Sequence, residues 1–323
     1  FAKRIMTFAR FTYKSINVAM KEDYDILFAT STPLTVGIPG VISRIIRGKP
    51  FIFEVRDLWP ELPIAMGIIK NPVIIFILKI FEKIIYKSSD RLVGLSPGIV
   101  RGIEREGISK DKIRLIPNGS DLKIFRDVSP KKLNQLDDSD FLAIYSGTHG
   151  IANHLDSALN AAIELKKRNH DAIKFAFIGA GKQKKELMEK AKDYSLENCI
   201  FVDPIPKLEL IQYLKSADIG MQILKNVPAF YDGTSPNKFF EYLASGLPVI
   251  NNYPGWLAEL IISENLGFVV EPNNPIDFAD KLEFAYENQT LLLKMRENCL
   301  RVASSSFDRE KLSGEFSEWI ETL

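Results

Sequence analysis

The chain has 323 residues, 46% of them hydrophobic, which predicts two domains of ordinary size with enough apolar side chains for two cores. Its 42 basic residues are balanced by 41 acidic ones, so bulk charge gives no support for a nucleic-acid-binding protein. Two cysteines exclude a disulfide framework and fit a reducing, cytoplasmic compartment. Cysteines and histidines show no metal-ligand spacing, so no metal site is expected.

Short apolar runs alternate with helical patterns through the first half of the chain. Strands are predicted at residues 25–30, 50–57, 91–96 and 112–119. Helices are predicted between them, at residues 37–47, 73–87 and 98–106. This alternation with short connections is typical of a parallel sheet covered on both faces.

The longest apolar stretch is NPVIIFILKIFEKIIYK, residues 71–87. Its lysines and glutamate interrupt it before the roughly 18 apolar residues that would span a bilayer, and no signal peptide is visible. Two interpretations remain open. The stretch is a buried helix of an α/β core, or it is a surface helix that touches a membrane through apolar and basic residues. The second interpretation predicts Lys79, Lys83 or Lys87 in solvent.

Residues 126–140 are polar and lack an apolar period, which predicts a linker between domains. The acidic residues Asp137, Asp138 and Asp140 are interpreted as part of a solvated linker, because no other ligand types surround them at metal-binding spacing.

The alternation then restarts. Strands are predicted at residues 141–147, 173–179, 199–204, 219–224, 248–251 and 267–272. A helical tail from residue 275 is predicted to break near residues 304–307. The predicted domains are residues 1–125, linker 126–140, a nucleotide domain at 141–303, and a final helix at 304–323 that packs back on the first domain.

The two halves are unequal, with four predicted strands against six. No glycine-rich ligand loop precedes Asp25, and the chain begins at Phe1 rather than Met. We therefore expect the first domain to lack its opening units.

The stretch YDGTSPNKFFEYLASGLPV, residues 231–249, reads as a helix. Ser235 is expected as the N-cap, Pro236 at the first helical position, and Gly246 at the end. Lys238 then faces the positive end of the helix dipole. Either an anion binds there, or Lys238 forms an i,i+3 ion pair with Glu241.

Three loops follow strands of the second sheet and should meet at its carboxyl edge, where ligands of open α/β sheets bind. They are residues 147–150, 179–182 and 232–241. Lys182 and Lys238, with the glycine-rich turns at Gly147 and Gly150, would suit a diphosphate. Glu241 would accept hydrogen bonds from the two hydroxyls of a ribose.

Five motifs together resemble the retaining nucleotide-sugar glycosyltransferases of the GT-B fold, glycosyltransferase family 4. The resemblance is to bacterial enzymes that add N-acetylated amino sugars in surface-polysaccharide and O-antigen assembly, the L-fucosamine transferase type. The motifs are FEVRDLWPE (53–61), LVGLSPG (92–98), IPNGSDLKIF (116–125), YSGTHGIANHLD (145–156) and SPNKFFEYLASGLPVI (235–250). They cover nearly the whole chain.

The resemblance implies an α/β GT-B fold of two doubly wound Rossmann-like domains that face each other across a cleft. It implies a donor site to which the matching motifs contribute. By the resemblance, Glu241 would bind the ribose, the turn at Pro204 would contact the base, and Gly147, Thr148 and Gly150 would lie by the diphosphate or the opposite substrate. The basic residue that many relatives carry at the start of the helix after the first strand of this domain is missing here, so Lys238 is the expected diphosphate partner. Ser235, Asn237 and Lys182 complete the predicted donor site. This sequence departs from the family at Gly233, where relatives carry a second glutamate; Asp232 stands beside it.

In the first domain, Asp57 and Glu61 are candidates for acceptor contact or proton removal. The alternative is that Arg56 and Asp57 form a structural ion pair and Trp59 packs.

The resemblance implies sugar transfer from a nucleoside diphosphate sugar, UDP-linked, to a lipid-linked saccharide, with retention at the anomeric carbon and without a metal or cofactor. It implies a cytoplasmic protein that can sit on the inner membrane face. The alternatives are a GDP sugar, a soluble acceptor, or a non-catalytic nucleotide-sugar-binding or scaffold protein. Because the first domain is expected to be incomplete, we expect this chain to fold its nucleotide site yet transfer little sugar.

Overall fold

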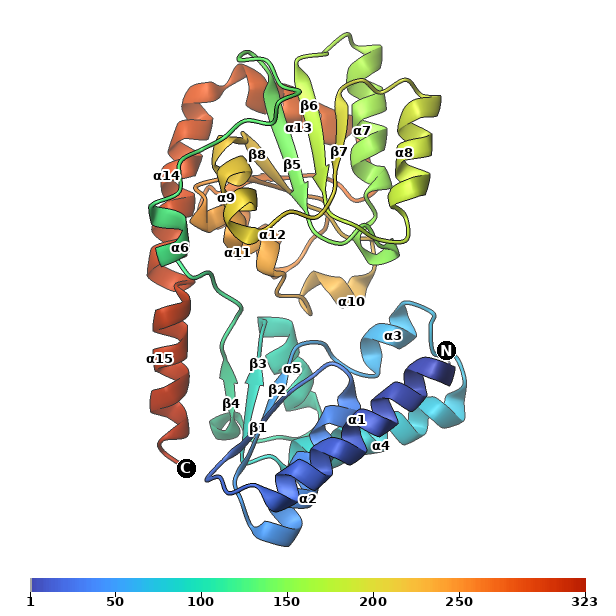
Figure 1. Ribbon diagram of the computed structural model, residues 1–323, viewed down its shortest axis with the longest axis vertical. Coiled ribbons are helices and arrows are strands. Elements are labelled where there is room, and N and C mark those ends of the chain that lie inside the picture. The colour runs from blue at the N-terminus through green and yellow to red at the C-terminus, as the bar shows by residue number, and fades with distance from the viewer. Residues whose placement is uncertain (1) are drawn as a thin grey trace. The chain divides into compact units, whose positions relative to one another are not determined.

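The computed structural model describes residues 2–323, and the chain forms two compact units (Figure 1). Unit 1 contains the chain up to Pro117, together with Val227–Ser235 and Leu312–Leu323. Unit 2 contains Asn118–Asn226 and Pro236–Lys311. The chain therefore passes between the units more than once, and each unit is described separately below.

The sheet of unit 1 has parallel strands in the order β1-β2-β3-β4. The strands are β1 (Leu27–Thr30), β2 (Phe51–Val55), β3 (Arg91–Gly94) and β4 (Ile113–Leu115). Side chains of β2 and β3, among them Phe51, Phe53 and Leu92, are fully buried in one apolar cluster. The parallel sheet predicted for the first half is confirmed.

The helices of unit 1 include the long helix α1 (Ala2–Lys21) and the short helices α3 (Glu61–Ala65) and α10 (Pro228–Tyr231), none of which was predicted from the sequence. The others are α2 (Gly37–Arg47), α4 (Pro72–Ser88) and α5 (Pro97–Arg105), with short 3-10 turns at Leu34–Val36 and Lys110–Lys112. No element was predicted before Asp25, but α1 is 20 residues long. Its first turn holds no acidic residue, and an acidic residue there is one of the signals that mark a helix start.

The last helix, α15 (Arg309–Ile320), ends within unit 1. Phe316 packs edge-on against Phe28 of β1, with ring centroids 5.4 Å apart. The guanidinium of Arg91 lies over the ring of Trp319 and also donates to the Thr322 hydroxyl. These contacts attach the C-terminus to the sheet of unit 1.

The sheet of unit 2 is parallel and has the order β10-β9-β8-β5-β6-β7. Its strands are β5 (Phe141–Ser146), β6 (Ile173–Ile178), β7 (Cys199–Val202), β8 (Ile219–Gln222), β9 (Val249–Asn251) and β10 (Gly267–Val269). Along the chain, the sheet grows in one direction from β5 to β7 and then in the other from β8 to β10. The order therefore reverses between β5 and β8, where doubly wound sheets bind ligands.

The helices of unit 2 cover this sheet on both faces. They are α6 (Lys123–Arg126), α7 (Asp156–Lys167), α8 (Lys184–Asp193), α9 (Lys207–Ser216), α11 (Asn237–Ala244), α12 (Trp256–Ser263), α13 (Pro275–Glu287) and α14 (Gln289–Ser306), with a 3-10 turn at Ile151–Asn153. The break predicted near residues 304–307 is confirmed at Phe307, and a second break lies at Asn288. The doubly wound α/β prediction for this half is confirmed.

The segment predicted as a solvated linker is only partly so. Asp137 and Asp138 are exposed, and Asp138 pairs with Lys132 at 2.9 Å. Leu133, however, is buried, and the Asp140 side chain is 7% exposed and lies 3.8 Å from the Lys174 ammonium. Leu133 thus anchors the segment in the protein interior, although the polar composition of residues 126–140 predicted a solvated linker.

Candidate functional site

Helix α11 begins one residue later than predicted. Pro236, with φ −75° and ψ 126°, is the N-cap, and Asn237 is the first helical residue. The prediction that Ser235 caps the helix is wrong, because the extended ψ of Pro236 delays the first helical turn. Lys238 therefore occupies the second helical position. The predicted end is confirmed, since Gly246 has φ 66°.

Lys238 and Glu241 are not ion-paired with each other, so that alternative is wrong. The Lys238 ammonium donates to the Tyr145 hydroxyl at 2.8 Å and approaches Asn153 Oδ1 at 3.4 Å. The Glu241 carboxylate instead pairs with Lys207, the first residue of α9. The two side chains thus reach different groups of residues within unit 2.

Lys238 lies at the carboxyl end of β5, beside the point where the strand order reverses. Its ammonium is 3.9 Å from the centroid of the Tyr145 ring, and a Cβ on Gly147 would lie 3.4 Å from the ammonium nitrogen. Burial lowers the pKa of Lys238 to about 7, although the nearby Glu241 carboxylate acts in the opposite direction. A cation held beside a glycine turn at such a point is suited to an anionic group.

The loops after β5 and β6 meet, as predicted. A Cβ on Gly179 would lie 1.9 Å from the Gly147 carbonyl oxygen, and one on Gly181 would lie 2.2 Å from that of His149. The His149 amide also donates to the Ala180 carbonyl at 2.9 Å. Glycine is therefore required at both positions for the loops to approach this closely.

Other predicted donor residues lie around these loops. Thr148 is exposed, and its carbonyl accepts hydrogen bonds from the Tyr145 hydroxyl at 2.9 Å and the Asn153 amide at 2.8 Å. Gly150 is the N-cap of the short turn that follows. Lys182, which follows Gly181, is exposed, and the structure does not test its predicted role at the diphosphate.

Ser235, Asn237 and Pro204 complete the predicted set. Ser235 is buried and is the last residue of the segment grouped with unit 1. Asn237 is exposed at the start of α11, in unit 2. Pro204 is exposed just after β7 and three residues before Lys207. The loop that carries Pro204 therefore leads to the partner of Glu241.

Sequence reasoning missed Lys184, Lys207 and His149. The Lys184 ammonium bonds to the carbonyls of Gly179 and Val202, each at 3.0 Å, so it holds two strand ends together. His149 is fully buried with both ring nitrogens unpartnered, and burial lowers its pKa to about 4. The THG sequence could have drawn attention to His149, but no local signal pointed to either lysine.

In unit 1, Asp57 follows β2 and accepts a hydrogen bond from the Thr32 hydroxyl at 3.0 Å. Burial raises the pKa of Asp57, while this hydrogen bond and the nearby Arg56 act to lower it. Arg56 lies 3.9 Å from the Glu54 carboxylate, and the alternative of an Arg56–Asp57 ion pair is not observed. A carboxylate with a raised pKa is suited to accepting a proton.

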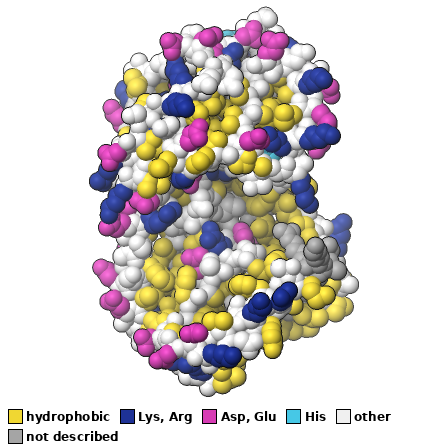
Figure 2. Space-filling model, viewed as in Figure 1, with side chains coloured by type: hydrophobic (Ala, Val, Ile, Leu, Met, Phe, Trp, Pro, Cys, Tyr) yellow, Lys and Arg dark blue, Asp and Glu magenta, His cyan; other side chains and the backbone are white. Residues whose placement is uncertain are grey.

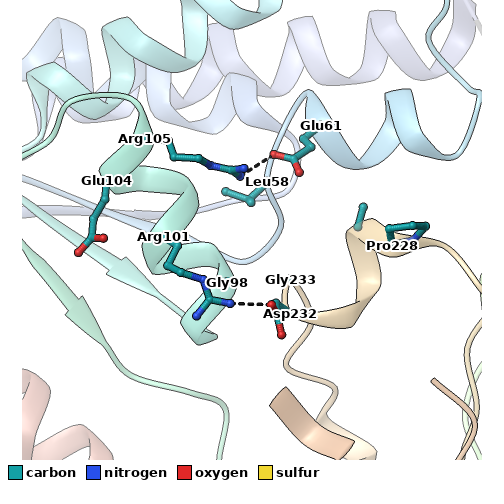
Figure 3. A pocket seen from close by; sticks show the side chains of 10 residues that line it. Leu58, Glu61, Gly98, Arg101, Glu104, Arg105, Pro228, Asp232 and Gly233 are labelled. Carbon is teal, nitrogen blue, oxygen red and sulfur yellow. Dashed lines mark hydrogen bonds and ion pairs between the residues drawn. The ribbon is translucent and has the colours of Figure 1, made fainter. Parts of the chain in front are cut away.

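Glu61 lines a charged cavity of about 570 Å³ within unit 1 (Figure 3). Its carboxylate pairs with Arg105 at 3.0 Å, and Arg101 pairs with Asp232 at 2.6 Å. Gly233, where the family resemblance led us to look for a glutamate, also lines this cavity.

The Val227–Ser235 segment is fixed to the start of α5. The Asp232 carbonyl accepts hydrogen bonds from the Gly98 amide at 3.2 Å and the Ser96 hydroxyl at 2.5 Å. A Cβ on Gly98 would lie 2.4 Å from the Asp232 carbonyl oxygen. This close approach explains the glycine in the LSPG sequence.

Within residues 2–323, no group of three or more histidine, cysteine or acidic side chains is arranged to hold a metal ion. At the edge of the unit 2 sheet, the groups that a ligand could contact are instead a lysine, a glutamate and backbone amides. These groups can bind a phosphate and a diol.

Residues 128–302 match the family described as glycosyl transferases group 1, and residues 3–119 match the glycosyl transferase 4-like domain. The chain belongs to the group 1 glycosyl transferases. The two matches together span both units.

Two curated relatives support this membership. The D-inositol 3-phosphate glycosyltransferase of Paenarthrobacter aurescens is 26% identical over 69% of this chain and 54% of its own length. A protein of Pseudomonas aeruginosa named "Probable glycosyltransferase WbjE" is 24% identical over 79% of this chain and 64% of its own length. The chain thus spans between about half and two thirds of these relatives.

The fold is shared with solved structures. HepE from Anabaena, solved in complex with UDP, superposes with a TM-score of 0.75 at 15% identity, over 98% of this chain and 82% of HepE. HepE has also been solved with UDP-glucose. The GT-B fold class predicted from the motifs is confirmed.

Proposed function

We propose that this chain transfers a sugar from a UDP-linked sugar, an N-acetylated amino sugar, to a lipid-linked saccharide in surface-polysaccharide assembly. The observation that carries the proposal is the arrangement on α11. Lys238 reaches the glycine loop after β5, and Glu241, one turn later, pairs with Lys207 at the start of α9. One helix thus offers a cation to a diphosphate and a carboxylate to a ribose. The UDP complex of HepE, a structural neighbour, supports a nucleotide in this fold.

The charge of the leaving group would be stabilised by the protein alone. When the bond between the anomeric carbon and the diphosphate breaks, negative charge develops on the diphosphate. The Lys238 ammonium and the backbone amide of Gly150 would stabilise that charge, whereas the Gly147 amide already donates to the Ile178 carbonyl at 2.9 Å. We propose on this basis that the reaction needs no metal or cofactor. Retention of the anomeric configuration is proposed from the resemblance to retaining enzymes alone.

The acceptor would be activated in unit 1. Its hydroxyl oxygen bonds to the anomeric carbon on the face from which UDP leaves, as retention requires, and its proton passes to a base. Asp57, whose pKa is raised by burial, is the proposed base, and Glu61 in the charged cavity is a proposed acceptor contact.

Calorimetry with UDP, followed by a turnover assay, tests the proposal. A thermal-shift screen of nucleoside diphosphate sugars first selects the donor, and release of UDP is then followed with lipid-linked saccharides as acceptors. We expect the chain to bind UDP more tightly than GDP. We also expect it to release UDP only when the donor sugar is present.

A second candidate is a protein that binds nucleotide sugars without turnover. Gly233 favours it, since this residue carries no side chain where the family resemblance led us to look for a carboxylate, and Asp232 beside it is paired with Arg101. Tight UDP binding with no UDP release from any donor and acceptor would favour this candidate.

The proposed location is the cytoplasmic face of a membrane, with the chain bound peripherally. Among residues 2–323, no helix combines the length and the apolar character that crossing a bilayer requires. Helix α4 presents exposed apolar side chains beside exposed lysines. That combination supports contact with an anionic surface.

A further inference from the structure

A second cavity of unit 1 is almost wholly apolar. It has a volume of about 580 Å³ and lies between α1 and α4, against the start of α2. Its walls include Phe8, Ile16, Leu34, Ile38, Trp59 and Leu78. None of its lining residues is charged, in contrast to the charged cavity at Glu61.

The wall holds few polar groups. The Thr12 hydroxyl donates to the Thr35 carbonyl at 3.5 Å, so it is directed at the protein backbone, while the buried Thr35 hydroxyl has no hydrogen-bond partner. An apolar cavity of this size is suited to a hydrocarbon and offers few partners to water.

The cavity is open to solvent. Ile68 and Ile74 both line it, yet they are 63% and 48% exposed. Figure 2 shows hydrophobic side chains gathered on the part of unit 1 where Figure 1 places α1 and α4. An apolar chain could therefore enter from outside.

One short stretch of chain borders both cavities. Leu58 and Glu61 line the charged cavity, while Trp59, between them, lines the apolar one. Pro33, in the apolar wall, directly follows Thr32, which holds the Asp57 carboxylate. The apolar cavity thus adjoins the proposed acceptor residues.

The surface around the opening carries basic charge. Helix α1 contains no acidic residue, and its Arg10 and Lys14 are exposed. On α4, Lys79 is exposed, and the helix's acidic residue, Glu82, is buried. Arg101 and Arg105 line the charged cavity, but each is paired there with a carboxylate, so the basic charge comes from α1 and α4. This charge complements a phosphate at the head of an apolar chain.

We propose that the apolar cavity binds the hydrocarbon chain of the phosphate-linked lipid acceptor and so selects acceptors by their chain. The proposal rests on the proposed function, whose acceptor is lipid-linked. The phosphate and saccharide then lie toward Glu61, Arg101 and Arg105.

Monoalkyl phosphates test the cavity directly, because they present one phosphate and one chain. Calorimetry below the micelle concentration compares butyl, octyl and dodecyl phosphate. Affinity should rise by up to about fourfold for each methylene group that becomes buried. Equal affinities for butyl and dodecyl phosphate would overturn the proposal.

Two substitutions reach the cavity from opposite walls. Ala9→Trp fills it from the exposed side of α1, and Ile74→Ser makes the α4 wall polar. Each should lower dodecyl phosphate affinity by about tenfold or more while butyl phosphate and UDP affinities stay unchanged. Ile80→Trp is the matched control, since Ile80 is exposed on α4 and does not line the cavity. Wild-type affinity in both cavity variants would refute the assignment.

Vesicle binding and sedimentation distinguish the acceptor lipid from other occupants of the cavity. UDP release distinguishes a failure of the cavity assignment from a failure of the proposed function. If Ala9→Trp weakens binding to phospholipid vesicles as much as binding to dodecyl phosphate, the cavity holds a membrane lipid and the proposal fails. If dodecyl phosphate dissociates a dimer in sedimentation, a second copy fills the cavity and the proposal also fails. Chain-length-dependent binding without UDP release from any donor would instead leave the cavity assignment standing and reject the proposed transfer.

Discussion

Glu241 combines partial burial with a partner that a ligand can replace. Its carboxylate is 21% exposed and is paired with Lys207, whose side chain is 40% exposed. A pair this open contributes little to stability, because water competes for both charges. We expect the Glu241 carboxylate to act instead by accepting two hydrogen bonds from a ribose.

We expect Glu241→Ala to weaken UDP binding by about 3 kcal/mol, which is more than a hundredfold, because two hydrogen bonds to a charged acceptor are lost. The melting temperature should stay close to that of the wild type. Calorimetry with UDP measures the first and thermal denaturation the second. Lys207→Ala is the control and should change UDP affinity much less. Normal UDP binding by Glu241→Ala would show that Glu241 is only an ion-pair partner.

Lys238 gives the site a pH dependence. Its pKa in the free protein is lowered to about 7 by burial, so the ammonium loses its proton as pH rises above 7. A bound diphosphate favours the charged form and raises this pKa. Binding must then take up a proton at higher pH.

UDP affinity should therefore fall by up to about tenfold per pH unit as pH rises above 7. The phosphate of UDP does not explain such a fall, since a terminal phosphate titrates near pH ~6. Lys238→Arg should flatten the profile, because arginine stays charged. Calorimetry from pH 7 to 9, in buffers of different ionisation enthalpy, measures affinity and proton uptake together. Uridine, which has no phosphate, should show no such fall, and a flat profile for UDP with the wild type would contradict the prediction.

Helix α4 exposes large apolar side chains along one side. Asn71 caps it through hydrogen bonds to the Val73 and Ile74 amides, and its buried face holds Ile85 and Tyr86. The opposite side exposes Val73, Phe76, Ile77, Ile80 and Ile84. The interpretation of α4 as a wholly buried core helix is therefore wrong, and the prediction that Lys79, Lys83 or Lys87 faces solvent is confirmed.

The chain should bind anionic vesicles more strongly than neutral ones, because α4 joins apolar side chains to lysines. Reversing Lys83 to glutamate should weaken that binding about fivefold or more, since one lysine near an anionic surface is worth about 1 kcal/mol. Vesicle co-sedimentation measures the difference. Lys185→Glu, at an 89% exposed lysine of unit 2, is the matched control and should bind as the wild type does. Equal binding to neutral and anionic vesicles would count against a membrane role.

At the scale of the whole molecule, the C-terminal helix α15 contributes side chains to the apolar core of unit 1. Leu312 joins the apolar cluster of the first sheet, and Trp319 lies beneath the guanidiniums of Arg91 and Arg114. Residues far apart in sequence thus share one core, and the donor residues of α11 lie in the other unit.

Trp319→Ala should destabilise unit 1 by about 2 kcal/mol, through lost packing of a half-buried aromatic side chain. UDP affinity should be unaffected. Chemical denaturation and calorimetry provide the two measurements, and Glu318→Ala, an exposed neighbour, should change neither. If Trp319→Ala weakened UDP binding as strongly as it lowered stability, the donor site would depend on the core of unit 1.

Much of the secondary structure followed from local sequence. Apolar runs such as FLAIYS and IKFAFI became buried parallel strands, because a strand covered on both faces must be apolar along its whole length. Helix α1 was missed because amphipathic spacing without start signals is weak evidence in isolation.

The chemistry of the donor site was partly predictable. The sequence by itself determined that Lys238 and Glu241 lie one turn apart on a helix that follows a strand. The residues that each of them contacts, Tyr145 and Lys207, are 93 and 34 positions away in sequence, and only the tertiary structure decided those pairings. Local patterns reflect dihedral preferences and burial within one segment, whereas the partner of a long side chain depends on how strand order brings separate loops to the same sheet edge.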